Sequence, residues 1–550
     1  MVHCSPQRRR LCSSLIKEFF GDTVERVCSV LVARGQQTLP EVVHASKLAA
    51  STVRSALLVL LQHNFVASEL VKPDADLRAA PPPYYLYHAD TGAIIQMLRM
   101  PRILQHVQRE YGGPGESDMA MQIIEVLLAH GRLRLGQIVA AVAARLERPE
   151  GDVQGELHPR FISLVNSRHV ERVPPADLPP SKPKAHGKPQ VKKKAEPKEG
   201  SKEKAEQEAE QVRKLAHKSY SDERFQLPLE LLFGAAAPKA AKPAARAKRK
   251  RDDETDDGGG QESEGSTSQP LWRVNFEEFN CRLRDEACTE HMAEMHGREA
   301  AALVAAMLRH AALQPGAGRA DAEVSAAVSA SAAAEQLAQM RRRQPELPVL
   351  TVNAASRILC ELAEDERSGV KRVGLQEAFF VDLGAITKAM RQMHIEAIVR
   401  DRFPPIGMRV FRLLTAKKQL EQKQVADYAM VPVRDARELL YRMLRAGFLT
   451  LQDVPRTADH AASRTIYTWR VDAAAVTRRV GEELLQTAAN LRARLHRELT
   501  EHGEVLARVE AGDAVLLPRE RAEVGRVSRM SALLETRLIA LDPLIALFHH

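Results

Sequence analysis

The same succession of helix-like and strand-like segments occurs near both ends of this 550-residue chain, and this repeat limits its possible folds more than any other feature. In the N-terminal copy, an amphipathic helix interrupted at Gly21 precedes a short helix near 40–44 and a third helix that begins at Ser51. Two extended stretches follow, at 65–70 and 84–87. The buried stripe of the first helix is expected to comprise Leu11, Leu15, Phe19, Val24, Val27 and Leu31. Three helices followed by a two-stranded wing predict a winged-helix domain.

The C-terminal copy shows the same order with clearer signals. Its helices and wing strands are expected at 408–416, 422–429, 434–446, 448–452 and 465–470. When Phe65 is aligned with Phe448, Asn64 falls on Gly447, and both of these residue types favour the left-handed conformation that ends a helix. The chain therefore contains an internal repeat at the level of structure.

Two weaker copies of the pattern lie between these ends. One copy has expected helices at 119–128 and 137–146 and a strand at 170–173. The other has its third helix at 354–364 and its wing at 370–373 and 379–381. A segment rich in alanine, glycine and serine, residues 313–345, interrupts this last copy, and we expect it to form a long loop.

The apolar period changes after the fourth copy. Leucine and alanine recur at steps of four and three residues over 484–495, and a second series follows Gly512 and Pro518. These two heptad series predict an antiparallel coiled-coil hairpin, with a kink or an end at Pro543. The candidate partner-docking residues of the second series are Val524, Val527, Leu534, Leu538 and Leu541.

The predicted fold is therefore mainly α with small β-wings: four tandem winged-helix domains and a C-terminal antiparallel coiled-coil hairpin. We expect winged helix 1 at 8–90, winged helix 2 at 116–174 and a disordered basic linker at 175–270. Winged helix 3, with its alanine-rich loop, is expected at 271–400, winged helix 4 at 404–472 and the hairpin at 473–550.

The linker at 175–270 is rich in proline, lysine, alanine and glutamate, so it should bury too little apolar surface to fold. Its basic tetrad, Lys248, Arg249, Lys250 and Arg251, fits a nuclear-import signal, although such tetrads also arise by chance in lysine-rich linkers. An apolar island at 225–233 is either a short docking motif or a transient helix.

The sequence shows no nucleotide-binding, metalloprotease or serine-hydrolase motif, so we do not expect an enzyme. The six cysteines form no C-x-x-C pair and no zinc spacing with histidine, so buried free thiols are expected, without a metal or cofactor. No uninterrupted apolar run is long enough for a membrane span or a signal peptide.

The net charge of +9 favours an acidic partner such as nucleic acid, although the linker contributes much of the excess. His63 also lies near the DNA-facing side of the first module, whereas Asp435 and Glu438 on the last recognition helix should repel phosphate. We therefore expect protein docking and non-specific DNA contact rather than base reading. The candidate DNA contacts are Lys47, Arg54, Lys371, Arg372, Lys417, Lys418, Lys423, Arg434 and Arg437.

Several longer segments point to a family. They are Leu11–Gly21, Leu60–Asn64, Met97–Arg102, Glu421–Met430 and Ser463–Tyr467. Together and in this order they resemble the third-largest subunit of RNA polymerase III, which is related to the alpha chain of general transcription factor IIE. The resemblance covers both ends well and the middle loosely, where the linker and the alanine-rich loop are longer than expected.

The resemblance implies a nuclear subunit without catalytic activity that sits on the clamp of the largest subunit with two smaller specific subunits. It also implies work with transcription initiation factors on promoter DNA, in promoter opening and initiation at genes for transfer RNA, 5S ribosomal RNA and other small RNAs. The alternative is a free-standing winged-helix regulator, which would bind a defined DNA site by itself.

Overall fold

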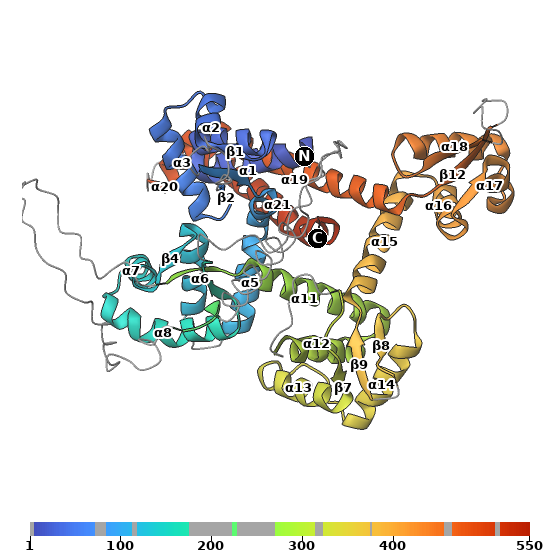
Figure 1. Ribbon diagram of the computed structural model, residues 1–550, viewed down its shortest axis with the longest axis horizontal. Helices are drawn as coiled ribbons and strands as arrows, with labels where there is room; N and C mark the ends of the chain where they lie inside the picture. Colours follow the sequence, from blue (N-terminus) through green and yellow to red (C-terminus); the bar gives the residue numbers. More distant parts are fainter. Residues whose placement is uncertain are drawn as a thin grey trace, which may run out of the picture. The chain divides into compact units, whose positions relative to one another are not determined.

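The computed structural model describes residues 5–71, 84–112, 118–174, 223–227, 270–313, 323–374, 377–455, 465–511 and 517–549. The chain divides into two compact units, one of residues 1–3 and 16–276 and the other of residues 4–15 and 277–550. Both are built from helices and small antiparallel sheets (Figure 1).

The first module, the N-terminal set of three helices and one sheet, follows the predicted order. Its helices and strands are α1 (Pro6–Arg34), β1 (Gln37–Thr38), α2 (Leu39–Ser46), α3 (Ala50–Gln62), β2 (Val66–Val71) and β3 (Tyr84–Ala89). Gly21 interrupts α1 with a φ of 84°, as the sequence indicates. The stripe is buried except at Phe19, which is 52% exposed. Before this kink the buried face instead includes Cys12 and Ile16, so the stripe does not extend to Phe19.

The second module is completed by a strand that we had assigned to the next domain. Its elements are α6 (Met119–His130), β4 (Leu133–Arg134), α7 (Leu135–Leu146), α8 (Glu150–Asn166), β5 (Val170–Arg172) and β6 (Leu271–Val274). β6 pairs with both β4 and β5, so the predicted boundaries at 174 and 271 are wrong. Pairing of strands so far apart in the chain leaves no local trace in the sequence. Between the first two modules lie α4 (Thr91–Ile95), η1 (Gln96–Arg99) and α5 (Met100–Tyr111).

The third module differs from the prediction in its alanine-rich segment. Its elements are α11 (Phe276–His296), α12 (Arg298–Leu313), β7 (Val328–Ser329), α13 (Ala330–Arg343), α14 (Val352–Glu364), β8 (Val370–Arg372) and β9 (Ala378–Val381). The long loop predicted at 313–345 is wrong for residues 328–343, which form β7 and α13. Alanine is the strongest helix former, and Ala333 and Leu337 are buried on the inner face of α13. Ser329 caps this helix by accepting from the Ala332 amide at 3.2 Å.

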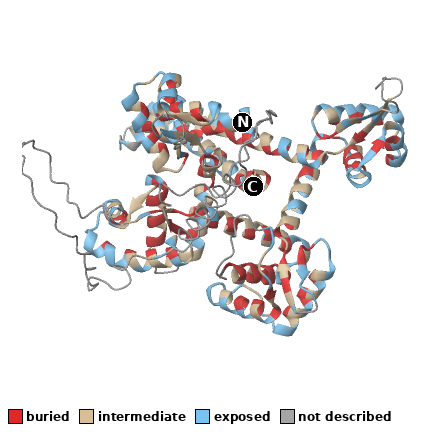
Figure 2. Ribbon diagram, in the orientation of Figure 1, coloured by how far each residue is buried: buried red, intermediate tan, exposed pale blue. Residues whose placement is uncertain are grey.

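The fourth module has the most complete match to prediction. Its elements are α15 (Leu383–Arg402), α16 (Pro405–Lys417), β10 (Gln419–Glu421), α17 (Gln422–Ala429), α18 (Val433–Arg445), β11 (Thr450–Pro455) and β12 (Thr465–Arg470). Phe411, Leu440, Phe448 and Trp469 are buried at its centre, and Val480 of the helix that follows belongs to the same core. Figure 2 shows buried residues along the inner faces of these helices and exposed residues around them.

One sheet topology recurs four times among the described residues. The strand orders are β1-β3-β2, β4-β6-β5, β7-β9-β8 and β10-β12-β11, and all pairs are antiparallel. In each case a residue with positive φ lies between the third helix and the wing: Asn64, Arg168, Gly369 and Gly447. The superposition of Asn64 on Gly447, made from sequence, is therefore confirmed in the backbone.

The C-terminal helices are α19 (Ala473–Glu501), α20 (Gly503–Glu510) and α21 (Pro518–His549), and α19 packs along α21. Val527 and Leu534, predicted to dock a partner, are 1% and 5% exposed. They are therefore wrong as docking residues, because a hydrophobic seam between two helices of one chain is already covered. Val524, Leu538 and Leu541 are half-buried on the same helix. α21 continues through Pro543 to His549.

The described cysteines are free thiols, and Cys12, Cys28, Cys281 and Cys288 are buried. Burial raises the pKa of Cys28 and of Cys288 to about 12. Among the described residues no helix has the length and apolar content needed to cross a bilayer.

Candidate nucleic-acid and protein interface

Five of the predicted DNA contacts lie in the fourth module. Lys417 and Lys418 follow one another at the end of α16, Lys423 is in the first turn of α17, and Arg434 and Arg437 are on α18. All five are exposed. Lys418 has a φ of 68°, so the chain turns sharply there and separates the two lysines from the strand that follows. Cations from three successive helices are therefore available to a phosphate backbone.

The recognition helix α18 carries charges of both signs on its outer face. Its inner face buries Ala436, Leu439, Leu440 and Met443 at the spacing of an amphipathic helix. The outer positions consequently present Arg434 and Arg437 together with Asp435 and Glu438, and all four are exposed. Carboxylates among the arginines oppose close approach to phosphate, so this face is poorly suited to reading bases in a groove.

The same part of the fourth module exposes large apolar side chains that the sequence reasoning missed. Tyr428 is 58% exposed, Met430 88%, Val433 48% and Tyr441 48%. Met430 ends α17 with a φ of 54°, which turns its side chain out of the core. A helical wheel of α18 could have identified Tyr441, since it falls on the polar side. An apolar patch beside cations is typical of a protein-binding surface. These four residues are called the turn patch below.

Cations stand over the aromatic rings of the turn patch. The Lys417 Nζ lies 5.9 Å from the centroid of Tyr428, and the Arg437 guanidinium lies 5.9 Å from that of Tyr441. Tyr441 in turn meets the buried Trp469 edge to face at 5.2 Å. Each contact holds an aromatic ring beside a cation, which suits a partner that offers both acidic and apolar groups.

The first module offers fewer cations than expected. Lys47, at the left-handed end of α2, and Arg54, on α3, are exposed as predicted. His63 is not on the outer face: its ring stacks on Phe65 at 5.7 Å and meets Phe20 edge to face at 4.7 Å. Burial, with a smaller effect from His130, lowers the pKa of His63 to about 4. The placement of His63 near the DNA-facing side of the module is therefore wrong, because the ring packs against Phe20 and Phe65 and is neutral at pH 7.

The end of α3 is used to contact the second module. The Gln62 side-chain amide donates to the His130 carbonyl at 3.1 Å and also to the Arg132 carbonyl. The Asn64 side-chain oxygen accepts from Arg132 at 2.9 Å and from Arg273 at 3.1 Å. Because this corner is filled by polar contacts with its neighbour, it serves packing between modules rather than an external ligand. This contact is called the closed corner below.

In the third module Lys371 lies 2.6 Å from the Asp382 carboxylate. The hydrogen bond from Lys371 lowers the pKa of Asp382. Lys371 is still largely exposed, and Arg372 beside it is exposed as well. A lysine that shares its charge with a carboxylate is a weaker phosphate ligand than one without such a neighbour.

Two predictions in the linker fall wholly or partly outside the described residues. The tetrad Lys248, Arg249, Lys250 and Arg251 lies outside them, and so does the apolar island from 228 onward. Residues 223–227 are ordered, so the prediction of disorder is wrong for this short piece. Arg224 pairs with the buried Glu171, and its carbonyl accepts from the Arg172 amide at 3.0 Å. Phe225 lies under the Arg168 and Arg224 guanidinium groups at 5.7 and 5.3 Å.

Comparison with known proteins agrees with this geometry. Residues 395–471 match a family described as the C-terminal winged-helix domain of POLR3C. Residues 10–67 match the helix-turn-helix domain of RNA polymerase III subunit RPC82, and residues 160–340 match another part of the same subunit family.

Full-length relatives cover most of the chain. It is 29% identical to the zebrafish (Danio rerio) protein named DNA-directed RNA polymerase III subunit RPC3, over 93% of this chain and 88% of the relative. The human protein of the same name is 27% identical over 92% of this chain and 87% of its own length. The rat protein is also 27% identical, with the same coverage of both chains.

The helices, wings and exposed cations are those of a protein built from several small helical modules, some of which are winged-helix domains. Within this class, the chain belongs to the RPC82/RPC3 family of RNA polymerase III subunits, and it is thus a partner of other subunits of that polymerase.

Proposed function

We propose that this chain is a non-catalytic nuclear subunit that docks on the clamp of the largest polymerase III subunit together with two smaller subunits. In this position it assists promoter opening and initiation at genes for transfer RNA, 5S ribosomal RNA and other small RNAs. The observation that carries the proposal is similarity to polymerase III subunits along 92% of the chain. The turn patch supports docking, since its exposed apolar side chains include aromatic rings that stand beside cations.

We further propose that all four modules are winged helices and that α19 and α21 form an antiparallel coiled-coil hairpin. The shared strand order and the left-handed corner support four copies of one fold. The packing of α19 on α21 and the burial of Val527 and Leu534 support the hairpin. Repeated small domains on one chain give several docking surfaces, which suits a subunit with many neighbours.

The role toward DNA that we propose is guidance without base reading. Lys417, Lys418 and Lys423 can neutralise phosphates, whereas Asp435 and Glu438 on α18 disfavour insertion of that helix into a groove. Initiation factors are expected to meet the same exposed faces of the assembled enzyme.

Affinity purification of the tagged full chain from nuclear extract tests the docking proposal. We expect the polymerase core and two smaller subunits to be recovered at equal amounts after a high-salt wash. Recovery of the chain without other polymerase subunits would contradict the proposal. The alternative, a free-standing regulator, predicts instead that the isolated chain selects one DNA site over random sequence by a thousandfold or more.

The hairpin proposal predicts different outcomes for two adjacent leucines. Leu534→Asp places a carboxylate at a position that is 5% exposed, and Leu533→Asp places it at one that is 51% exposed. We expect the first variant to lose helicity and to leave the assembly, because a buried charge costs about 3 kcal/mol or more. We expect the second variant to keep its helicity by circular dichroism. Equal helicity and equal incorporation of the two variants would remove the hairpin from the docking proposal.

A further inference from the structure

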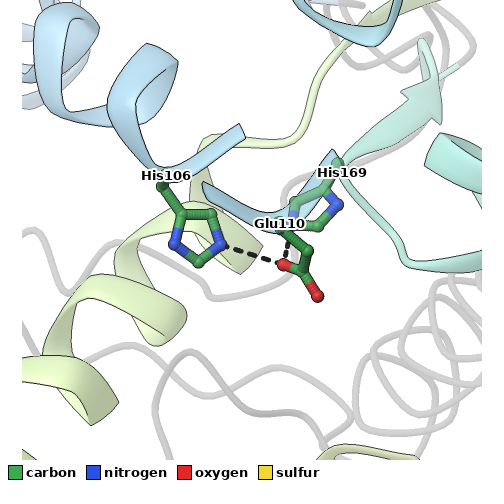
Figure 3. A group of neighbouring side chains, drawn as sticks. All are labelled: His106, Glu110 and His169. Atoms are coloured by element: carbon green, nitrogen blue, oxygen red, sulfur yellow. Dashed lines mark ion pairs between the residues drawn. The ribbon is translucent and has the colours of Figure 1, made fainter. Parts of the chain in front are cut away.

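Three potential metal ligands from distant parts of the sequence converge in the first unit. α5 presents His106 and Glu110 one turn apart on the same face, so the spacing H-x-x-x-E places both side chains side by side. His169 enters from the chain that follows α8, immediately after the left-handed residue Arg168. Figure 3 shows the two imidazoles on either side of the carboxylate.

The three ligand atoms lie close enough together to approach one ion. The Glu110 Oε2 lies 3.2 Å from the His106 Nε2 and 4.0 Å from the His169 Nε2. One ligand atom from each of the three residues lies within 4.8 Å of the other two. Since zinc bonds to nitrogen and oxygen are about 2.0–2.1 Å long, tetrahedral ligand atoms stand about 3.4 Å apart. The 3.2 Å between Glu110 and His106 is slightly shorter than this, whereas the 4.0 Å between Glu110 and His169 is longer, so His169 would have to move closer to bind the same ion.

Two hydroxyl groups contact the far nitrogen of His169. The Ser167 hydroxyl lies 2.8 Å from His169 Nδ1 and the Tyr111 hydroxyl 3.1 Å from it, and the two hydroxyl oxygens are 2.5 Å apart. The Nε2 of the same ring faces Glu110, 4.0 Å from its Oε2. Hydrogen bonding of the far nitrogen orients a metal-bound histidine.

Both histidines direct Nε2 at the same carboxylate oxygen, His106 from α5 and His169 from the chain after α8. One cation placed among the three ligand atoms would contact all three residues. A proton shared by Glu110 and one histidine, as in an ordinary ion pair, would join only two of them.

We propose that His106, Glu110 and His169 bind one Zn²⁺ or a similar borderline divalent cation, with water as the fourth ligand. Two imidazoles exclude Mg²⁺ and Ca²⁺ as preferred ions, since those cations prefer all-oxygen sites. The side chains of His106 and Glu110 are 15% and 14% exposed, so the cluster is not wholly closed to solvent. The ion would link α5 to the end of α8 and so fix this helix against the second module.

Cobalt titration of the untagged full chain, freed of metal by a chelator, tests this site. We expect one equivalent of Co²⁺ to give the intense visible absorption of a tetrahedral ion, and Zn²⁺ to displace it. Elemental analysis should then show one zinc ion per chain, and zinc should raise the thermal midpoint of the protein.

Variants separate this site from other histidines in the chain. Glu110→Gln and His106→Gln should weaken binding at least tenfold and abolish the shift of the midpoint with zinc, while circular dichroism shows that they remain folded. His44→Ala changes an exposed histidine of α2 and should bind as the unmodified chain does. Absence of a cobalt spectrum in the unmodified chain, or an unchanged spectrum in both Gln variants, would overturn the proposal and leave a histidine–glutamate ion pair.

Discussion

The first and fourth modules share a fold but expose different surfaces. In both, a left-handed residue joins the third helix to the wing, Asn64 in one and Gly447 in the other. In the first module this corner is closed by the side chains and backbone of the second module. In the fourth, the exposed turn patch lies on α17, on α18 and in the turn between them rather than at the corner at Gly447, and Lys417 and Arg437 stand beside its rings.

This difference shows that the winged-helix topology does not decide which face of a module binds a partner. In the first module the end of the third helix packs on the second module, whereas in the fourth the exposed apolar residues lie on α17, on α18 and in the turn between them. The two modules also differ in exposed positive charge. His63 of the first module is neutral and packs against aromatic rings, whereas Lys417 and Arg437 of the fourth module are exposed cations. The predictions below alter one corner and use the other as its control.

The largest effect is expected for Gly131→Ala at the closed corner. Gly131 has a φ of 77°, and a methyl group there would lie 2.9 Å from the Gln62 carbonyl carbon and in direct collision with its oxygen. The two modules would have to separate, at a cost of about 3 kcal/mol or more. Gly447→Ala is the control: its φ is 80°, but its nearest neighbour is a flexible Arg479 carbon at 3.7 Å, so about 1 kcal/mol is expected. Thermal unfolding of the two variants measures the difference, and equal midpoints would show that the corner is not tightly packed.

A smaller loss is expected for Asn64→Ala. The substitution removes an acceptor for Arg132 and Arg273 and places alanine at a φ of 62°, for a combined cost of about 2 kcal/mol. Asn64→Gly keeps the backbone conformation and removes the hydrogen bonds alone, so about half of the loss should remain. If the glycine variant is as stable as the unmodified chain, the two arginine contacts contribute nothing to stability.

Reversal of charge on the fourth module should weaken DNA binding by at least tenfold. Lys417→Glu, Lys418→Glu and Lys423→Glu together remove up to three phosphate contacts, and the salt dependence of log K should fall by about 0.9 per contact. Lys47→Glu with Arg54→Glu in the first module should have a smaller effect, on the order of threefold. Fluorescence anisotropy with arbitrary duplex DNA measures both.

A matched control for these variants changes three exposed cations elsewhere in the second unit, Arg342, Arg343 and Lys388, to glutamate. In the assembled polymerase the triple lysine variant should initiate less without leaving the complex. Affinity and salt dependence equal to those of the control would exclude DNA guidance by this module.

The smallest effect concerns acid stability at the closed corner. The pKa of His63 falls from an ordinary value near 6.5 to about 4 on folding, so the unfolded chain binds more protons between these values. The stability that depends on neutral His63 is complete above pH 6.5 and is lost as the pH falls toward 4. After allowance for partial exposure of the ring, the loss between pH 7 and pH 5 is on the order of 1 kcal/mol. His63→Phe keeps the aromatic contacts with Phe20 and Phe65 and should remove this component from the pH dependence of the unfolding midpoint. An unchanged dependence would mean that His63 titrates normally.

Local patterns in the sequence sufficed for most helices and for the wings. The limits of α17 and β12 were predicted to the residue, and α14, α16 and α18 within a few residues, because amphipathic periods and glycine or asparagine stops are properties of neighbouring residues. The alanine-rich segment was misread because small residues suggested a loop, although alanine favours the helix α13 once its apolar side is buried.

The candidate surfaces were less accessible to the same reasoning. Exposure of the five cations of the fourth module could be inferred from the helical wheel, whereas exposure of Met430 depends on a left-handed turn at that residue. Val527 and Leu534 carried the correct heptad pattern, but the pattern does not say whether the covering helix belongs to the same chain.

By itself the sequence determined the order of helices and wings, the repeat of one module and, through extended family motifs, membership among polymerase III subunits. These features depend on residues close together in the chain or on long ordered motifs. Only the tertiary structure decided that β6 completes the second sheet, that Gln62 and Asn64 close one corner, and that His106 and Glu110 meet His169. Each of these joins residues that are far apart in sequence, where chain periodicity carries no signal and packing alone sets the partner.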